Sequence, residues 1–198
     1  AIVRLSLEFP RKVIAFTGHG AGAGTAVLAM MLLAGEGGPL SRAMKASRVQ
    51  CYAFGPPPTF EPLWALPAWV CASTYAFMYG MDCVPRTCLT SLLKLHGAVR
   101  QVDALPMTAL QRLAFVRGRL HMDYSLPDNV VSSDDKKPLG SLFVVGTIIL
   151  LYRRDNGTLC CESLPPAYAE QLLLHRDMAN DHIMPLYEQA AAEVDSDT

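Results

Sequence analysis

Short apolar segments separated by glycine and proline breaks run along most of the chain. Residues 13–16 are β-branched or aromatic and stop at a Thr-Gly pair, which predicts a short buried strand. Residues 25–34 are strong helix formers and are apolar on nearly all sides, as in a helix pressed onto a sheet. Two further strands are predicted over residues 49–54 and 70–78, each ended by a glycine-containing turn.

The second half of the chain mixes helical, loop and hairpin patterns. We predict helical residues 85–120 with a break near Pro106, a polar surface loop over 122–138, hairpin strands 143–152 and 158–162, and a helix over 185–194 before a frayed end at 195–198. The arginines between 112 and 119 are interpreted as a solvated helix face. Strands that alternate with helices in this way predict an α/β fold with a mostly parallel sheet.

The composition is that of one apolar domain. Of the 198 residues, 51% are hydrophobic and 18% are charged, so intrinsic disorder is excluded for most of the chain. Seventeen Lys and Arg balance eighteen Asp and Glu for a net charge of -1, which gives no electrostatic reason to expect nucleic acid as a partner. The apolar runs are well short of the ~20 residues of a membrane-spanning helix, so no transmembrane segment is predicted in this chain.

The cysteine pattern gives no sign of a metal site. The six cysteines are Cys51, Cys71, Cys83, Cys88, Cys160 and Cys161. No CxxC occurs, and a zinc site would have to recruit distant histidines, so we expect no metal. Reduced thiols used as small buried hydrophobes are the favoured interpretation, and they indicate a cytoplasmic or membrane-associated protein.

One glycine-rich segment carries the candidate chemistry. Residues 17–24, TGHGAGAG, lie between a predicted strand and a predicted helix, which is the context of a G-x-S-x-G nucleophile elbow. Gly18 and Gly22 occupy the flanking positions, His19 lies inside the elbow, and Gly20 stands at the nucleophile position. Glycine adopts the strained elbow backbone at little cost, where another residue loses about 1–3 kcal/mol. A phosphate-binding loop fits poorly because the GK[ST] of a P-loop is absent, so no cofactor is expected.

Three segments together resemble the class 3 (fungal-lipase-like) serine lipases, and among them the sn-1-specific diacylglycerol lipases. They are TGHGAGAGTA at 17–26, CYAFGPPP at 51–58 with YGMDCVPR at 79–86, and FVVGTIILLYR at 143–153 with DHIMPLY at 181–187. The resemblance extends over almost the whole chain and departs from the family pattern at Gly20, where the nucleophilic Ser is expected. It implies an α/β-hydrolase fold.

The resemblance also implies roles for individual residues. Asp82 matches the triad acid and His182 the triad base, and both should converge on Gly20. The backbone N–H of Ala21 would supply one oxyanion donor. Taken alone, Asp82 would be interpreted as a turn residue and His182 as a capping or surface histidine. The same reasoning leaves His19 structural, and His96, His121 and His175 as ordinary surface residues.

Two functions follow from the resemblance. The first is ester hydrolysis of acylglycerols, diacylglycerol or triacylglycerol, at a membrane surface by a Ser-His-Asp-type site that is inactive or impaired because of Gly20. The alternative is a non-catalytic lipid-binding or regulatory scaffold, and the sequence does not distinguish either from a working enzyme altered at residue 20. Asp134 and Asp135 are interpreted as solvated turn charges rather than a calcium site, because calcium needs six to eight oxygen ligands.

The position of the elbow near the start of the chain suggests a missing structural neighbour. In α/β-hydrolases several strands precede the elbow strand, whereas only residues 1–12 precede the first predicted strand here. Without a neighbour this strand would present an unpaired edge to water. We therefore expect residues 1–198 to be the C-terminal portion of a larger lipase-like domain, which pairs with upstream strands of the same protein or with a partner segment.

Overall fold

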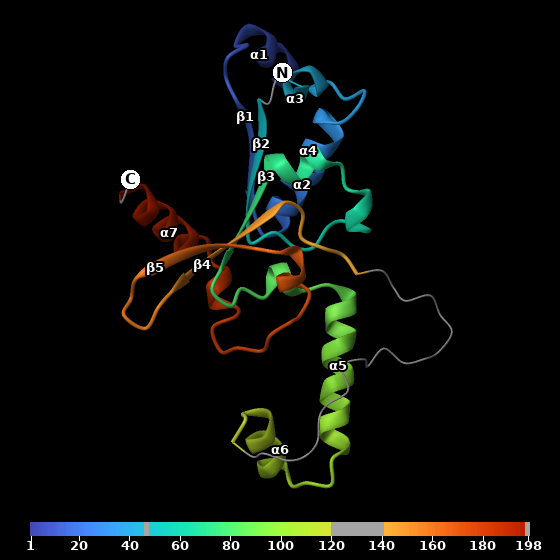
Figure 1. Ribbon diagram of the computed structural model, residues 1–198, viewed down its shortest axis with the longest axis vertical. Coiled ribbons are helices and arrows are strands. Elements are labelled where there is room, and N and C mark those ends of the chain that lie inside the picture. Colours follow the sequence, from blue (N-terminus) through green and yellow to red (C-terminus); the bar gives the residue numbers. More distant parts are fainter. Residues whose placement is uncertain (46–47, 120–140, 197–198) are drawn as a thin grey trace, which may run out of the picture.

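Figure 1 shows the computed structural model, which describes residues 1–45, 48–119 and 141–196. Its strands form one sheet in the order β1 (Ile14–His19), β2 (Val49–Phe54), β3 (Thr74–Tyr79), β4 (Thr147–Arg153) and β5 (Leu159–Leu164). The first four strands run parallel, and β5 returns antiparallel to β4. The predicted α/β fold with a mostly parallel sheet is therefore confirmed.

Helices pack on both faces of this sheet. The described helices are α1 (Ile2–Glu8), α2 (Ala21–Ala34), α3 (Ser41–Lys45), α4 (Ala68–Ser73), α5 (Leu89–Ala104), α6 (Ala109–Val116) and α7 (Met184–Ser196). Helices α2, α3 and α4 share one core with the sheet and α7 shares another. Strand side chains alternate between the faces. Cys51 and Ala53 of β2 lie in the core shared with α2, α3 and α4, whereas Phe54 packs in the cluster of Tyr187 and Ala190 from α7.

The strand predicted over residues 70–78 is wrong in its first part. Residues 70–73 belong to helix α4, and β3 begins at Thr74. Pro67 precedes the helix, and the two buried positions Val70 and Ser73 are three residues apart, which matches one side of a helix. A β-branched residue and a cysteine inside a short apolar run were not sufficient to tell helix from strand.

Other boundaries also differ from the predictions. Helix α2 begins at Ala21, four residues earlier than expected, because the Gly20 carbonyl already accepts hydrogen bonds from the amides of Ala23 and Gly24. Residues 143–146 precede β4 and make only an isolated bridge between Phe143 and Phe60. Helix α7 continues through residues 195 and 196, which were expected to fray. Helices α1 and α3 were not predicted.

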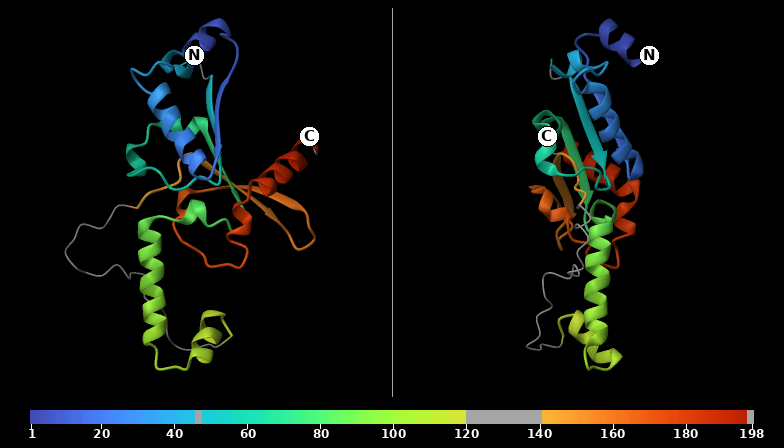
Figure 2. Two further views of the ribbon diagram at one scale, coloured as in Figure 1. Left: turned by 180° about the vertical axis from the view of Figure 1, so that it is seen from behind. Right: turned by 90° about the vertical axis from the view of Figure 1, so that its right-hand side faces the viewer.

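Helices α5 and α6 extend away from the sheet (Figures 1 and 2). They confirm the predicted helical segment and its break near Pro106. Only Ser91 and Gly97 of α5 are buried, and no residue of α6 is. None of the described helices is long and apolar enough to cross a membrane. The predicted polar loop over 122–138 falls outside the described residues.

The six cysteines are free thiols, but the expectation that they are buried is only partly correct. Cys51 is buried in β2, and burial raises the pKa of its thiol to about 11. Cys71 in α4 and Cys161 in the edge strand β5 are exposed. The remaining three are partly buried.

Candidate active site

The candidate site lies where β1, β2 and β3 end, at the carboxyl edge of the parallel sheet. Each of these strands is followed at once by a glycine with positive φ: Gly20 at 55°, Gly55 at 54° and Gly80 at 48°. The amides of all three glycines still donate to a neighbouring strand, to the carbonyls of Phe54, Phe77 and Leu151. Each strand therefore keeps its pairing to the last residue and then turns sharply, as glycine allows.

The elbow at Gly20 has the backbone that a nucleophile elbow requires. Gly20 has φ 55° and ψ -126°, a region that side chains rarely adopt. A Cβ on Gly18 would collide with the backbone of Gly22 and lie 2.8 Å from the amide nitrogen of Ala23. Gly18 thus permits the close approach of β1 and α2. A Cβ on Gly22 would meet nothing within 4 Å, so Gly22 contributes only its backbone.

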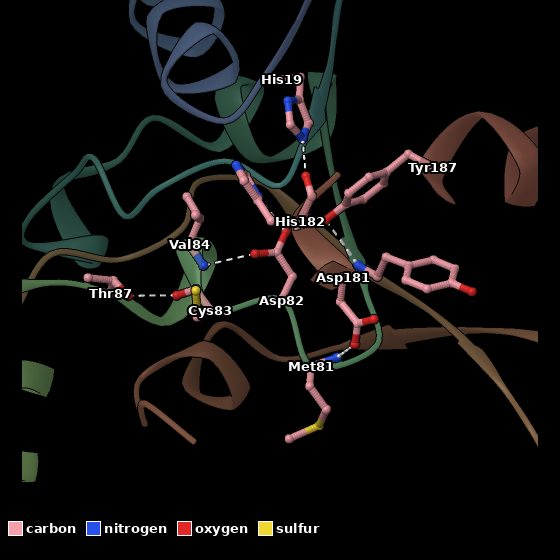
Figure 3. A network of polar contacts seen from close by, with 10 residues as sticks. His19, Met81, Asp82, Cys83, Val84, Thr87, Asp181, His182 and Tyr187 are labelled. Carbon is pink, nitrogen blue, oxygen red and sulfur yellow. Dashed lines mark hydrogen bonds and ion pairs between the residues drawn. The ribbon is translucent and has the colours of Figure 1, made fainter. Parts of the chain in front are cut away.

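Asp82 is fully buried at the turn after β3, and its carboxylate accepts hydrogen bonds on both oxygens (Figure 3). The Val84 amide donates to Oδ1 at 2.8 Å. The imidazole Nδ1 of His182 at 2.9 Å and the hydroxyl of Tyr187 at 2.5 Å both donate to Oδ2. Because both carboxylate oxygens of Asp82 act as hydrogen-bond acceptors, the His182 proton lies on Nδ1. The lone pair of the imidazole is then left on Nε2.

His182 faces the elbow with that Nε2. A Cβ on Gly20 would lie 3.0 Å from Nε2 and 3.3 Å from Cε1. The structure therefore brings Gly20, Asp82 and His182 together, with the imidazole between the buried carboxylate and the elbow. The imidazole is 26% exposed, whereas Asp82 is fully buried.

His19 supports the imidazole from the strand side. Its Nε2 lies 2.7 Å from the backbone oxygen of His182, and the two rings stack with centroids 4.5 Å apart. The Tyr187 ring meets the His19 ring edge-on at 5.7 Å. His19 therefore contacts both the backbone and the ring of His182.

Three further residues shape the site and were not predicted. The hydroxyl of Tyr187 joins Asp82 to the backbone amide of Tyr79, which donates to it at 3.1 Å. Burial, and then the Asp82 carboxylate, raise the pKa of Tyr187, so the phenol stays a proton donor. Asp181 accepts from the Met81 amide at 2.8 Å and ties the segment before α7 to the turn that carries Asp82.

The third unpredicted residue is Gly55, which lies beneath the acid and the imidazole. A Cβ there would be 2.7 Å from Asp82 Oδ2 and 3.0 Å from His182 Nδ1. A glycine directly after a parallel strand was the signal that could have identified it, because that position faces the carboxyl edge of the sheet.

The N-terminus of α2 completes the site. The Gly20 carbonyl accepts from Ala23 and Gly24, whereas the amide of Ala21 has no hydrogen-bond partner among the described residues. Ala21 is the first residue of a 14-residue helix, where free amides and the helix dipole favour negative charge.

The other titratable candidates lie elsewhere. His96 and His175 are exposed, as expected, while His121, Asp134 and Asp135 fall outside the described residues. Within the described ranges, no group of His, Cys, Asp and Glu side chains could hold a metal ion.

Comparisons with known proteins relate this geometry to the lipases. Residues 1–92 match the family described as Lipase (class 3), and this stretch contains the elbow and Asp82 but not His182. A solved triacylglycerol lipase, described as having a serine protease triad as its catalytic centre, is similar at 18% identity and a TM-score of 0.44, over 91% of this chain and 50% of that one. The chain thus spans half the length of that lipase, and no curated protein matches. The chain is class 3 lipase-like over the stretch that carries the elbow and the acid.

Proposed function

We propose that the chain carries a lipase-type ester hydrolase site for acylglycerols that is impaired by glycine at the nucleophile position. The observation that carries this proposal is the Asp82–His182 pair, held with Nε2 3.0 Å from the position of a Cβ on Gly20. A serine hydroxyl at this point would lie within reach of the imidazole, which is the nucleophile-base geometry of acyl transfer.

Each residue has a defined role in this reaction. His182 takes the proton of the nucleophile and returns it to the leaving alcohol, while Asp82 holds the imidazole tautomer and stabilises its charged form. The Ala21 amide donates to the developing oxyanion. Gly18 and His19 are positioning residues, because one lets β1 approach α2 and the other holds the backbone of His182.

The substrate class is supported by the surface of α5 and α6. Seven large apolar side chains are exposed there: Leu89, Leu92, Leu93, Val99, Leu110, Leu113 and Val116. Residues 89–119 also contain five basic residues and one acidic residue, Asp103, which pairs with Arg112 at 2.6 Å. Exposed apolar and basic side chains on one arm fit an anionic membrane surface, where an acylglycerol would be met. This proposal differs from the interpretation of the arginines as a solvated helix face.

The open edge of β1 supports the expected partner. In the described part of the chain β1 pairs with β2 alone, and it is the outermost strand of the sheet. We infer that upstream strands of the same protein, or a partner segment, pair with this edge and complete a larger lipase-like domain. The present chain would then form the C-terminal portion of that domain.

The decisive experiment restores the nucleophile in the full-length protein. Gly20→Ser should raise hydrolysis of a soluble p-nitrophenyl ester, and of diacylglycerol in vesicles, by at least about 100-fold over the parent. Gly20→Ala is the matched control, because it adds the same Cβ and the same backbone strain without a hydroxyl. Only the Gly20→Ser protein should react with a fluorophosphonate. Folded Gly20→Ser protein that gains nothing over Gly20→Ala would remove the catalytic proposal, and diacylglycerol binding without turnover would then favour a lipid-binding scaffold.

A further inference from the structure

The imidazole of His182 presents a base with no protein partner. Its Nδ1 is held by Asp82, and no described group hydrogen-bonds to Nε2. Figure 3 shows the ring standing next to the Asp82 carboxylate, with the His19 ring beyond the backbone oxygen of His182. An imidazole whose tautomer is fixed by a buried carboxylate is oriented for proton transfer, whatever group supplies the proton.

Glycine leaves the region in front of Nε2 free of side-chain atoms. The position of a Cβ on Gly20 lies 3.0 Å from Nε2, so any larger residue would fill this region. The imidazole is 26% exposed, so part of the ring is in contact with water. A water molecule beside the Gly20 backbone can therefore donate its O–H to Nε2.

The hydrogen-bond donor for the oxyanion does not depend on a side chain at residue 20. The free amide of Ala21 lies one residue from Gly20 at the N-terminus of α2, and it is a backbone group that a substitution at residue 20 leaves in place. A carbonyl oxygen bound at this amide would place its carbon near the elbow, between the helix N-terminus and the imidazole.

The geometry points to direct hydrolysis, in which water takes the place of the serine hydroxyl and no acyl-enzyme forms. This inference rests on the proposed ester hydrolase function. The water oxygen attacks the ester carbonyl carbon while His182 Nε2 takes its proton, and the resulting oxyanion is bound by the Ala21 amide. The tetrahedral intermediate then collapses with cleavage of the carbon–oxygen bond to the alcohol. His182 returns its proton to the leaving alkoxide, so that one ester and one water give one acid and one alcohol.

A second consequence is that small alcohols should act as nucleophiles in the same position. Methanol has one O–H to donate to Nε2 and is little larger than water, so it should attack the ester directly and form a methyl ester. In a serine enzyme the first product leaves when the serine is acylated, before any methanol takes part. Methanol should therefore speed release of the first product in direct hydrolysis, but not in the serine mechanism.

The test is a single-turnover assay of p-nitrophenyl butyrate with the protein in excess. In the full-length parent, release of p-nitrophenol should rise in proportion to added methanol, with methyl butyrate as product and no reaction with a fluorophosphonate. In Gly20→Ser the same release should be independent of methanol. The inference is overturned if release by the parent does not respond to methanol, or if an acylated protein is detected by mass spectrometry.

Three variants assign the reaction to this site. His182→Gln should lower the parent rate by at least about 100-fold, the usual contribution of a general base, whereas His96→Gln, at an exposed histidine on α5, should leave it unchanged. Gly20→Ala should lower it by at least about tenfold, because the methyl group displaces the nucleophile from Nε2. Thermal melting confirms that each variant is folded. A parent rate equal to that of folded His182→Gln contradicts the inference.

The same set of proteins separates this inference from the proposed function. If Gly20→Ser is active and the parent shows no His182-dependent rate, direct hydrolysis is wrong and the lipase-type site stands. If neither protein shows a His182-dependent rate, both proposals fail.

Discussion

The carboxylate of Asp82 is a polar group that has no contact with solvent. Removing a carboxylate from water costs several kcal/mol unless hydrogen bonds replace its hydration. Val84, His182 and Tyr187 supply those bonds, and the tyrosine makes the shortest of them at 2.5 Å. The site is therefore coupled to stability through one residue.

Tyr187→Phe should destabilise the protein by about 1–3 kcal/mol. It removes one donor from Asp82 and leaves the buried amide of Tyr79 without its acceptor. Tyr152→Phe is the matched control, because Tyr152 donates to Glu162 at the same 2.5 Å in an exposed pair, and its loss should cost no more than about 0.5 kcal/mol. Urea unfolding of both variants measures the difference, and equal losses would contradict the coupling.

At the residue scale, the sequence indicated Gly20, Asp82 and His182 but not the groups that hold them. Gly20, Asp82 and His182 stand in the sequence motifs, and Gly20 and Asp82 also follow predicted strands. Tyr187 lies in the quoted segment DHIMPLY, yet its contact with Asp82 spans 105 residues of sequence. No local pattern encodes such a contact, because it depends on where α7 packs.

At the scale of elements, the three glycines after β1, β2 and β3 form one row that receives the segment before α7. Gly20 and Gly55 face the imidazole of His182, and Gly80 faces the carboxylate of Asp181, with a Cβ there 2.5 Å from Oδ2. Three neighbouring strands thus end in residues without side chains where Asp181 and His182 lie. The row explains how the acid and the base approach the sheet so closely.

Gly55→Ala should be markedly more damaging than Gly157→Ala. Both glycines have positive φ, so alanine strains the backbone by about 1–2 kcal/mol at either site. A methyl group on Gly157 meets nothing within 4 Å, whereas one on Gly55 presses on Asp82 and His182, which adds about 1–3 kcal/mol. Thermal unfolding should show the extra loss of stability only for Gly55→Ala. Similar melting temperatures for the two variants would contradict the close approach of Gly55 to Asp82 and His182.

The sequence predicted most elements because their ends are marked by glycine and proline. The bounds of β2 agree with the prediction, and Gly157 lies in the turn of the β4–β5 hairpin, between the two predicted hairpin strands. The exposed helix α1 escaped prediction, because it buries none of its residues and so lacks an apolar face directed at a core. Local propensity marked where elements end better than it separated a short helix from a strand.

At the scale of the whole molecule, the arm formed by α5 and α6 extends away from the sheet (Figure 1) and buries only Ser91 and Gly97. Exposed leucines and valines alternate there with basic side chains, while the chain as a whole has a net charge of -1. The arm is therefore more positive than the chain as a whole, and this charge favours contact with an anionic surface.

Leu110→Ser should weaken binding to vesicles that contain phosphatidylserine by about tenfold, because one buried leucine contributes roughly 1.5–3 kcal/mol. Leu32→Ser is the matched control: Leu32 on α2 is 78% exposed and Leu110 on α6 is 80% exposed, but Leu32 lies outside the arm. Vesicle sedimentation measures both. Equal effects of the two substitutions, or equal binding to vesicles of phosphatidylcholine alone, would contradict a docking role for the arm.

During synthesis of the chain, Asp82 is added 100 residues before His182, which covers it. A growing polypeptide that has already left the ribosome with all five strands still lacks the imidazole, the phenol and the helix that shield Asp82. Premature termination just before residue 181 would therefore leave the five described strands and Asp82 without His182 and Tyr187. The two side-chain hydrogen bonds to Asp82 Oδ2 therefore form only after synthesis has passed Tyr187.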